Sequence, residues 1–325
     1  MRCRLALLAC GAVLLLPASA SADTSFGLRH QVRDLDVRGN HLAWTVSDGR
    51  GRYHLRAGFG STVHALPVRT AGFFRGIDLG TDRRGHTVLV YARCPERERA
   101  PCDLYLYRPG SQRERRLDSV SRRACSESKP RIARGVLLFT RRARRSHSPS
   151  GRCSGGLFIK RPGHLLRRLR RRAPSSYDFN GRYVAFERDI IRPLSSEEQR
   201  FDTEIRLLRV GARRSRLVAG ARGTTDRTGR HGTFLSDPRL DRGFVYWQRA
   251  RLGMGERDDI VRRAVAGGPR TTLARAGRLW VGASPEGDDL FLFAVSGRRL
   301  FYLFGGAAGQ PGVRIGRVEP VPVFR

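Results

Sequence analysis

The chain has 325 residues and a formal net charge of +34 at pH 7, from 63 basic and 29 acidic side chains. Such a field favours contact with polyanions. All but two of the basic residues, Lys129 and Lys160, are arginine. This skew is typical of a GC-rich genome, so part of the charge reflects codon composition. Beyond the N-terminus no segment is long and apolar enough to cross a membrane, so no transmembrane segment is expected.

The first 22 residues have the pattern of a signal peptide. Arg2 and Arg4 precede an apolar stretch at 5–16, and small residues at 18–22 fit the cleavage rule. Cleavage removes 1–22 and predicts export, to the extracellular space or the cell wall. A lipoprotein box ending at Cys10 is the alternative, and it is disfavoured because the apolar stretch continues past it.

The mature chain repeats one pattern, a short apolar strand that ends in an aromatic residue. Six such residues recur at intervals of 47, 48, 47, 61 and 46 residues: Trp44, Tyr91, Phe139, Phe186, Trp247 and Phe293. A period of 40 to 50 residues is typical of one β-propeller blade. We therefore expect residues 23–325 to form a single all-β domain, a six-bladed propeller with four antiparallel strands in each blade.

Each repeat divides into four strands, for example 76–80, 87–92, 103–108 and 115–120 in the second unit. The aromatic strands are apolar at successive positions, which indicates burial on both faces. One segment, 164–173, has leucines at near-helical spacing. Its place in the repeat is that of an outer strand, and we favour the strand over the helix.

The last unit carries a sharper motif. Ala283-Ser284-Pro285-Glu286-Gly287-Asp288-Asp289 and the apolar strand to Phe293 resemble the signature of the TolB-type, WD40-like (PD40) β-propeller repeat. The other five units keep the glycine and the aromatic residue but lack the Ser-Pro pair. The resemblance implies a six-bladed propeller used chiefly as a docking surface, and sometimes as the companion of a catalytic domain.

Four long segments are expected to be loops on one face: 141–155, 187–203, 219–237 and 248–259. Insertions that gather on one face of a repeat fold usually build its binding surface. Guanidinium groups bind phosphate, sulfate and carboxylate groups well. The candidate binding residues on this face are Arg141, Arg142, Arg144, Arg145, His147, Arg200, Arg227 and His231. Composition alone is the competing explanation for the arginines.

Four cysteines remain after cleavage. Cys94 and Cys102 bracket one hairpin loop, and Cys125 and Cys153 lie in the connections that follow. An even number in an exported chain predicts two disulfides. The expected pairs are Cys94–Cys102 and Cys125–Cys153, and a cross-unit pair such as Cys102–Cys125 is the alternative.

The sequence lacks the common catalytic and cofactor motifs, and its cysteines and histidines lack metal-ligand spacing. No catalytic residue, cofactor or metal is therefore assigned. The first functional hypothesis is a non-catalytic binding or scaffold module for a protein or an anionic cell-envelope polymer. The second is a propeller enzyme, a lyase or hydrolase, that acts on an anionic polysaccharide. Nucleic acid is disfavoured as a partner because of the export signal.

Overall fold

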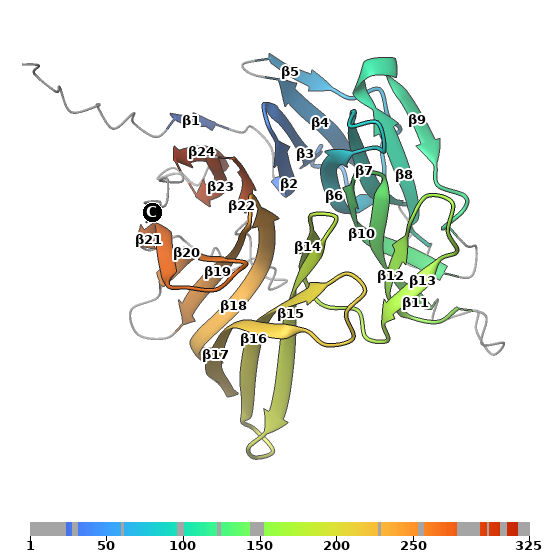
Figure 1. Cartoon of the computed structure of the whole chain (residues 1–325). Coiled ribbons are helices and arrows are strands. Elements are labelled where there is room, and N and C mark those ends of the chain that lie inside the picture. The colour runs from blue at the N-terminus through green and yellow to red at the C-terminus, as the bar shows by residue number, and fades with distance from the viewer. Residues whose placement is uncertain are drawn as a thin grey trace, which may run out of the picture.

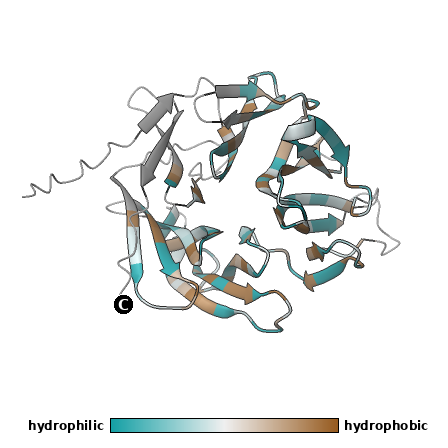
Figure 2. Ribbon diagram, turned by 45° about the horizontal axis from the view of Figure 1, so that its top comes forward, coloured by the Kyte–Doolittle hydropathy of each residue, from teal (hydrophilic) through white to brown (hydrophobic). Residues whose placement is uncertain are grey.

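A computed structural model describes residues 24–27, 32–59, 62–95, 101–121, 125–143, 153–226, 229–252, 257–277, 293–297, 299–305 and 311–317. These residues form antiparallel strands, and a single 3-10 turn (Pro109–Ser111) is the helical element among them. Figure 2 shows the sheets arranged around a common centre. The described part of the chain is thus all-β, as the repeat predicts.

Most sheets contain four strands that follow one another in the chain (Figure 1). The first contains β2 (Val32–Arg38), β3 (His41–Ser47), β4 (Tyr53–Phe59) and β5 (Thr62–Ala65). The second contains β6 (Phe73–Thr81), β7 (Thr87–Cys94), β8 (Asp103–Arg108) and β9 (Arg113–Arg116). The third contains β10 (Cys125–Ala133), β11 (Val136–Ala143), β12 (Gly156–Lys160) and β13 (Arg167–Arg170). The strand at β13 confirms the strand reading of 164–173.

An eight-stranded sheet follows. Its strands are β14 (Tyr177–Phe179), β15 (Tyr183–Pro193), β16 (Gln199–Arg209), β17 (Arg216–Asp226), β18 (Gly229–Asp241), β19 (Phe244–Leu252), β20 (Arg257–Ala264) and β21 (Arg270–Gly277). The last sheet has the order β1-β24-β23-β22. Its strands are β1 (Thr24–Gly27), β22 (Phe293–Ser296), β23 (Arg299–Gly305) and β24 (Pro311–Arg317). The N-terminal strand therefore completes the sheet formed by the C-terminal part of the chain.

The strands nearest the common centre contact one another in sequence. β2 contacts β6, β6 contacts β10, β10 contacts β14, β14 contacts β18, β18 contacts β22, and β22 contacts β2. The six repeated aromatic residues lie between neighbouring sheets and are at most 3% exposed. The repeat thus marks the core of each four-stranded unit, because these strands are covered on both faces.

Carboxylates on the inner strands link adjacent units. Asp36 on β2 accepts a hydrogen bond of 2.6 Å from the backbone N–H of Leu79 on β6. Asp78 on β6 accepts one of 2.6 Å from the N–H of Ile132 on β10. Asp178 on β14 accepts one of 2.7 Å from the N–H of Leu240 on β18. Each carboxylate satisfies a backbone donor of the next inner strand, so these bonds fix how the sheets are spaced.

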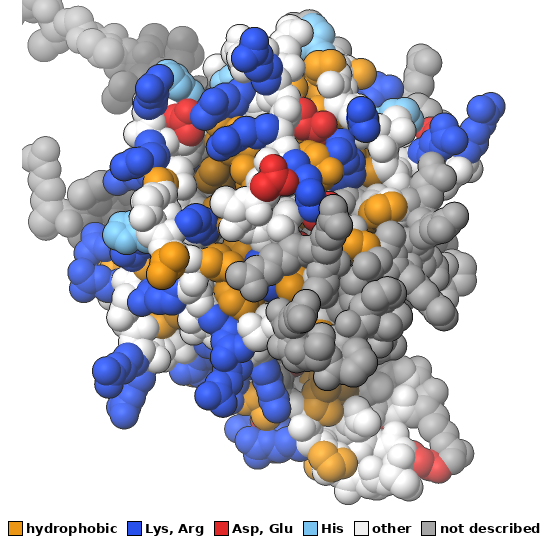
Figure 3. Space-filling view, turned by 90° about the vertical axis from the view of Figure 1, so that its right-hand side faces the viewer, with side chains coloured by type: hydrophobic (Ala, Val, Ile, Leu, Met, Phe, Trp, Pro, Cys, Tyr) orange, Lys and Arg blue, Asp and Glu red, His pale blue; other side chains and the backbone are white. Residues whose placement is uncertain are grey.

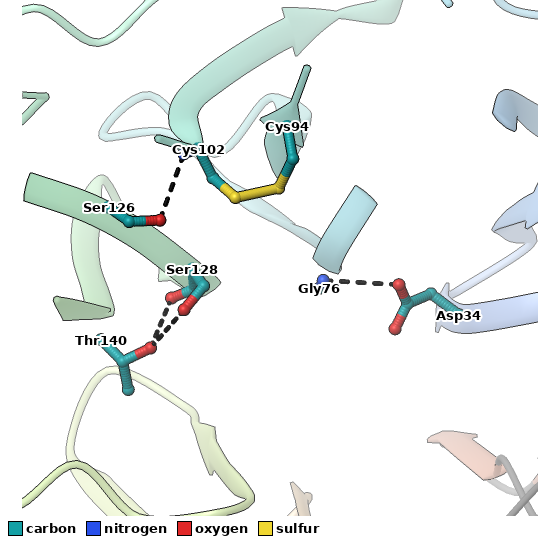
Figure 4. The surroundings of a disulfide bond; sticks show 7 residues. All are labelled: Asp34, Gly76, Cys94, Cys102, Ser126, Ser128 and Thr140. Carbon is teal, nitrogen blue, oxygen red and sulfur yellow. Dashed lines mark hydrogen bonds between the residues drawn. A yellow bond between two sulfur atoms is a disulfide. The ribbon is translucent and has the colours of Figure 1, made fainter. Parts of the chain in front are cut away.

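Both expected disulfides are present, Cys94–Cys102 and Cys125–Cys153. Figure 4 shows the first of them, with the backbone N–H of Cys102 donating to Ser126 Oγ at 3.1 Å. The same region holds a further link between units, in which the backbone N–H of Gly76 donates to Asp34 at 3.4 Å. The sequence-based pairing is therefore confirmed.

Three of the four segments expected to be loops are largely strand where they are described. Residues 187–203 and 219–237 are mostly strand, because β15 and β16 extend into a long hairpin and β17 and β18 continue into each other. Residues 248–259 also lie largely on β19 and β20. The loop assignment is wrong for most of the described residues of these three segments, since their backbone groups pair with one another. Residues 1–22 and 283–292, which carry the signal-peptide and repeat motifs, lie outside the described residues.

Candidate anion-binding surface

The β15–β16 hairpin projects beyond the four-stranded part of its unit, at the bottom of Figure 1. Its register is continuous from Tyr183–Arg209 to Pro193–Gln199. At the tip the backbone N–H of Leu194 donates to the carbonyl of Glu198 at 2.9 Å. Ser195 Oγ accepts from the backbone N–H of Glu198 at 3.1 Å. The hairpin is therefore closed by a defined turn, and β17 covers one of its edges.

Arginines gather on one face of this projection, because alternate residues of a strand point to the same side. The register places Arg188 opposite Glu204, and Arg192 opposite Arg200. We call this surface the arginine face. Its members are Arg188 and Arg192 on β15, Arg200, Asp202, Glu204 and Arg206 on β16, and Arg222 on β17.

The five guanidinium groups form ion pairs with two carboxylates. Asp202 lies 3.0 Å from Arg200, 3.6 Å from Arg222 and 3.8 Å from Arg192. Glu204 lies 2.8 Å from Arg206 and 3.6 Å from Arg188. The side chains of Arg188, Arg192 and Arg222 are 48%, 60% and 79% exposed. The face therefore has a net positive charge, and part of it is open to a ligand.

An arginine of the preceding sheet adds to this charge. Arg170 on β13 lies over the ring of Phe186, with its guanidinium carbon 4.2 Å from the ring centroid. Burial lowers the pKa of Arg170, and the charges of Arg188 and Arg206 lower it further. A bound anion would relieve this repulsion between like charges.

The opposite side of the projection carries packed aromatic side chains. Phe201 on β16 packs near Phe234 on β18, with ring centroids 6.3 Å apart, and the guanidinium of Arg230 lies 5.8 Å from both rings. Gly223, opposite Phe201 in the register, leaves room for Phe234, since a Cβ there would lie 2.5 Å from its ring. Packing on this side holds the arginine face in place.

The structure brings together two of the residues predicted to bind. The register forms one transverse row of Arg192, Arg200, Thr224 and His231 across β15 to β18. His231 Nε2 also lies 3.3 Å from Asp226, so it belongs to a local polar pair. Arg200 and His231 therefore share one row of this sheet.

The arginine cluster expected at 141–145 is not a surface loop as far as it is described. Arg141 lies on β11 and is buried, with Nε 2.9 Å from Glu127 and a hydrogen bond of 2.6 Å to the carbonyl of Val120. Its predicted role as an exposed anion ligand is therefore wrong, because its charge is used inside the fold. Arg142 is exposed on the same strand. Arg144, Arg145, His147 and Arg227 lie outside the described residues.

A second group of charges lies on the inner strands and was missed by sequence reasoning. Arg131 on β10 lies 3.3 Å from Asp178 and 3.7 Å from Asp78, and donates to the carbonyl of Ile77 at 2.7 Å. Burial raises the pKa of Asp36 and Asp78 above the ordinary value, while the charge of Arg131 opposes the rise. These groups bond to one another and to backbone, and their role is to join units.

Within the described residues, no group of three or more His, Cys, Asp or Glu side chains is arranged to hold a metal ion. No described helix is long and apolar enough to cross a membrane. Figure 3 shows one side of the molecule, where basic side chains are widespread and acidic ones are few. The arginine face differs from this general background because its arginines are ordered in rows on paired strands.

No protein family and no curated protein matches the sequence. Among solved structures, a puromycin-hydrolysing peptidase from Mycobacterium tuberculosis is similar over 91% of this chain, with 12% identity and a TM-score of 0.52. The chain spans 55% of that peptidase. TolB from Acinetobacter baumannii is similar over 88% of this chain and 79% of its own, with 10% identity and a TM-score of 0.46. The β-propeller domain of the Trilobed protease from Pyrococcus furiosus is similar over 90% of this chain and 99% of its own, with 9% identity and a TM-score of 0.44.

At these identities the likeness concerns the fold. The described part of the chain is all-β and built of antiparallel sheets, four with four strands and one with eight, and its structural neighbours include β-propellers.

Proposed function

We propose that the protein is an exported, six-bladed β-propeller of the TolB type that binds an anionic polymer of the cell envelope through its arginine face. The observation that carries the proposal is the arginine face itself, in which five arginines share two carboxylates on a projecting sheet. A polymer with regularly spaced phosphate, sulfate or carboxylate groups matches such rows, since each guanidinium offers two parallel donors.

Six blades are supported by the ring of inner-strand contacts from β2 to β22 and back to β2. In this reading the eight-stranded sheet holds two blades, β14–β17 and β18–β21, joined where Gly223–Asp226 pair with Gly229–Gly232. Export is supported by the two disulfides, which persist in oxidising compartments, and by the signal-peptide pattern at 1–22.

The test replaces the three exposed members of the face, Arg188, Arg192 and Arg222, with Gln. Dextran sulfate serves as the probe, because its repeating sulfates imitate an anionic polymer. An exposed ion pair contributes about 0.2–1 kcal/mol. The triple variant should therefore bind roughly three- to a hundredfold more weakly at 150 mM salt. Its thermal stability should change little, since exposed ion pairs contribute little.

A matched control removes the same charge elsewhere. Arg84, Arg213 and Arg214 are exposed in short turns of the other face, and their replacement by Gln should weaken binding less than threefold. Equal losses in the two variants would show attraction by net charge alone. Shortening of the polymer during incubation would support the enzyme hypothesis in place of the binding module.

A further inference from the structure

A cavity of about 460 Å³ opens among short turns at the opposite end of the strands from the arginine face. Three units contribute to it through the β10–β11, β14–β15 and β18–β19 turns. The volume is within the range of about 300–1,000 Å³ that is common for small-molecule sites. Its lining residues are Ala133, Arg134, Val136, Asn180, Gly181, Arg182, Tyr183, Gly243 and Val265.

The cavity has a preformed shape, because its turns are tied by hydrogen bonds. Asn180 Oδ1 accepts from the backbone N–H groups of Arg182 at 3.1 Å and Tyr183 at 2.9 Å. The backbone N–H of Arg134 donates to Thr81 Oγ1 at 3.2 Å. The N–H of Val265 donates to the carbonyl of Gly243 at 2.7 Å. Little reorganisation is needed for a ligand to enter.

The lining combines apolar walls with positive charge. Ala133, Val136, Val265 and the ring of Tyr183 are apolar, and no acidic residue is among the lining residues. Arg134 and Arg182 are exposed, and neither has a carboxylate partner within the described part of the chain. This differs from the arginine face, where Asp202 and Glu204 engage every guanidinium.

Arg182 is held beside the cavity by its neighbour. Its guanidinium carbon lies 5.3 Å from the centroid of the Tyr183 ring, which is within the range of a cation–π contact. A planar guanidinium held in this way can bind a carboxylate or phosphate without losing much rotamer freedom.

We propose that this cavity binds a small amphipathic anion, an aromatic or aliphatic body that carries a carboxylate, sulfonate or phosphate group. The body packs against Val136, Tyr183 and Val265, and the anionic group lies between Arg134 and Arg182. This site is separate from the arginine face and does not depend on the proposed function.

The test uses 8-anilinonaphthalene-1-sulfonate, an aromatic sulfonate whose fluorescence rises in apolar surroundings. The folded protein should bind one equivalent at 150 mM salt, and phenyl phosphate should compete. The double variant Arg134→Gln/Arg182→Gln should bind the probe at least tenfold more weakly. Val265→Trp, which fills the cavity and keeps both charges, should also weaken binding at least tenfold.

The control is Arg213→Gln/Arg214→Gln, which removes equal charge from a nearby exposed turn and should change the affinity less than twofold. The arginine-face variant should bind the probe normally, so failure of either proposal can be recognised separately. Unchanged binding by Val265→Trp, or equal losses in the two arginine pairs, would overturn the cavity site.

Discussion

Arg141 offers a sharp prediction, because sequence and structure assign it opposite roles. As an exposed anion ligand it could be replaced with little effect on stability. In the structure the Glu127 side chain is 0% exposed and that of Arg141 is 4% exposed, with 2.9 Å between Arg141 Nε and Glu127 Oε1. The Arg141 guanidinium also lies 4.9 Å from the Phe158 ring centroid.

Arg141→Met keeps much of the side-chain volume and leaves the Glu127 carboxylate buried without its cation. Loss of one partner of a buried ion pair costs about 3–5 kcal/mol. For a domain of this size we expect the melting temperature to fall by roughly 5–10 °C. Arg141→Met combined with Glu127→Met should cost less than Arg141→Met alone, because it leaves no unpaired buried charge.

Thermal and urea unfolding of the two variants measure these changes, with Arg142→Met as the control. Arg142 is exposed on the same strand, and its replacement should stay within about 0.5 kcal/mol. If Arg141→Met were as mild as Arg142→Met, or if the double variant were the least stable of all, the buried-pair reasoning would be refuted.

Three further predictions concern the inner strands and their neighbours. Burial and the nearby carboxylates of Asp189 and Asp237 raise the pKa of Glu187 to about 8. The folded state therefore holds this proton more tightly than the unfolded chain, and the stability from it is lost as pH rises from about 4.5 to 8. Glu187→Gln should remove that loss, which amounts to at most about 1.4 kcal/mol per unit of pKa shift. Urea unfolding at pH 5, 7 and 9 measures it, and an equal change of unfolding free energy with pH in both proteins would contradict the prediction. Gly80→Ala should lower the melting temperature, because a Cβ would lie 1.8 Å from the carbonyl oxygen of Ile132. Gly110→Ala is the control and should melt like the unchanged protein, since a Cβ there meets nothing within 4 Å. Asp178→Ala should cost about 2–4 kcal/mol by removing a backbone acceptor and a partner of Arg131, and a cost under 1 kcal/mol would argue against the inter-unit bonds.

The repeat could be predicted from sequence because burial on both faces imposes a simple pattern. Trp44, Tyr91, Phe139, Phe186 and Trp247 all lie on the second strand of a four-stranded unit, as their spacing indicates. The disulfide pairs could be predicted from the same strand assignment, because it places the cysteines together at strand ends on one edge.

The projecting sheet was harder to predict. Residues 187–203 show no regular alternation of polar and apolar side chains, and they include Pro193 and a Ser-Ser pair that indicate a loop. The strands form there because the two arms of the hairpin pair with each other and with β17, which is a tertiary effect. The available signal was a two-residue period of charged side chains at 200, 202, 204 and 206.

The buried charges could not be assigned from composition. In a chain with 63 basic residues, nothing local distinguishes Arg141 from exposed arginines, and its partner Glu127 is 14 residues away. The aspartates of the inner strands carry a clearer signal, because Asp78 and Asp178 each stand between apolar residues of a short strand. A lone carboxylate in such a position indicates a specific buried bond.

Hydrogen–deuterium exchange of the protein with and without dextran sulfate tests the central claim most directly. The arginine face predicts new protection confined to the backbone of 187–206 and 216–226, lost in the Arg188, Arg192 and Arg222 triple variant. Protection spread evenly over the exposed arginines, or confined to the short turns of the other face, would contradict a dedicated anion-binding surface on the β15–β16 projection.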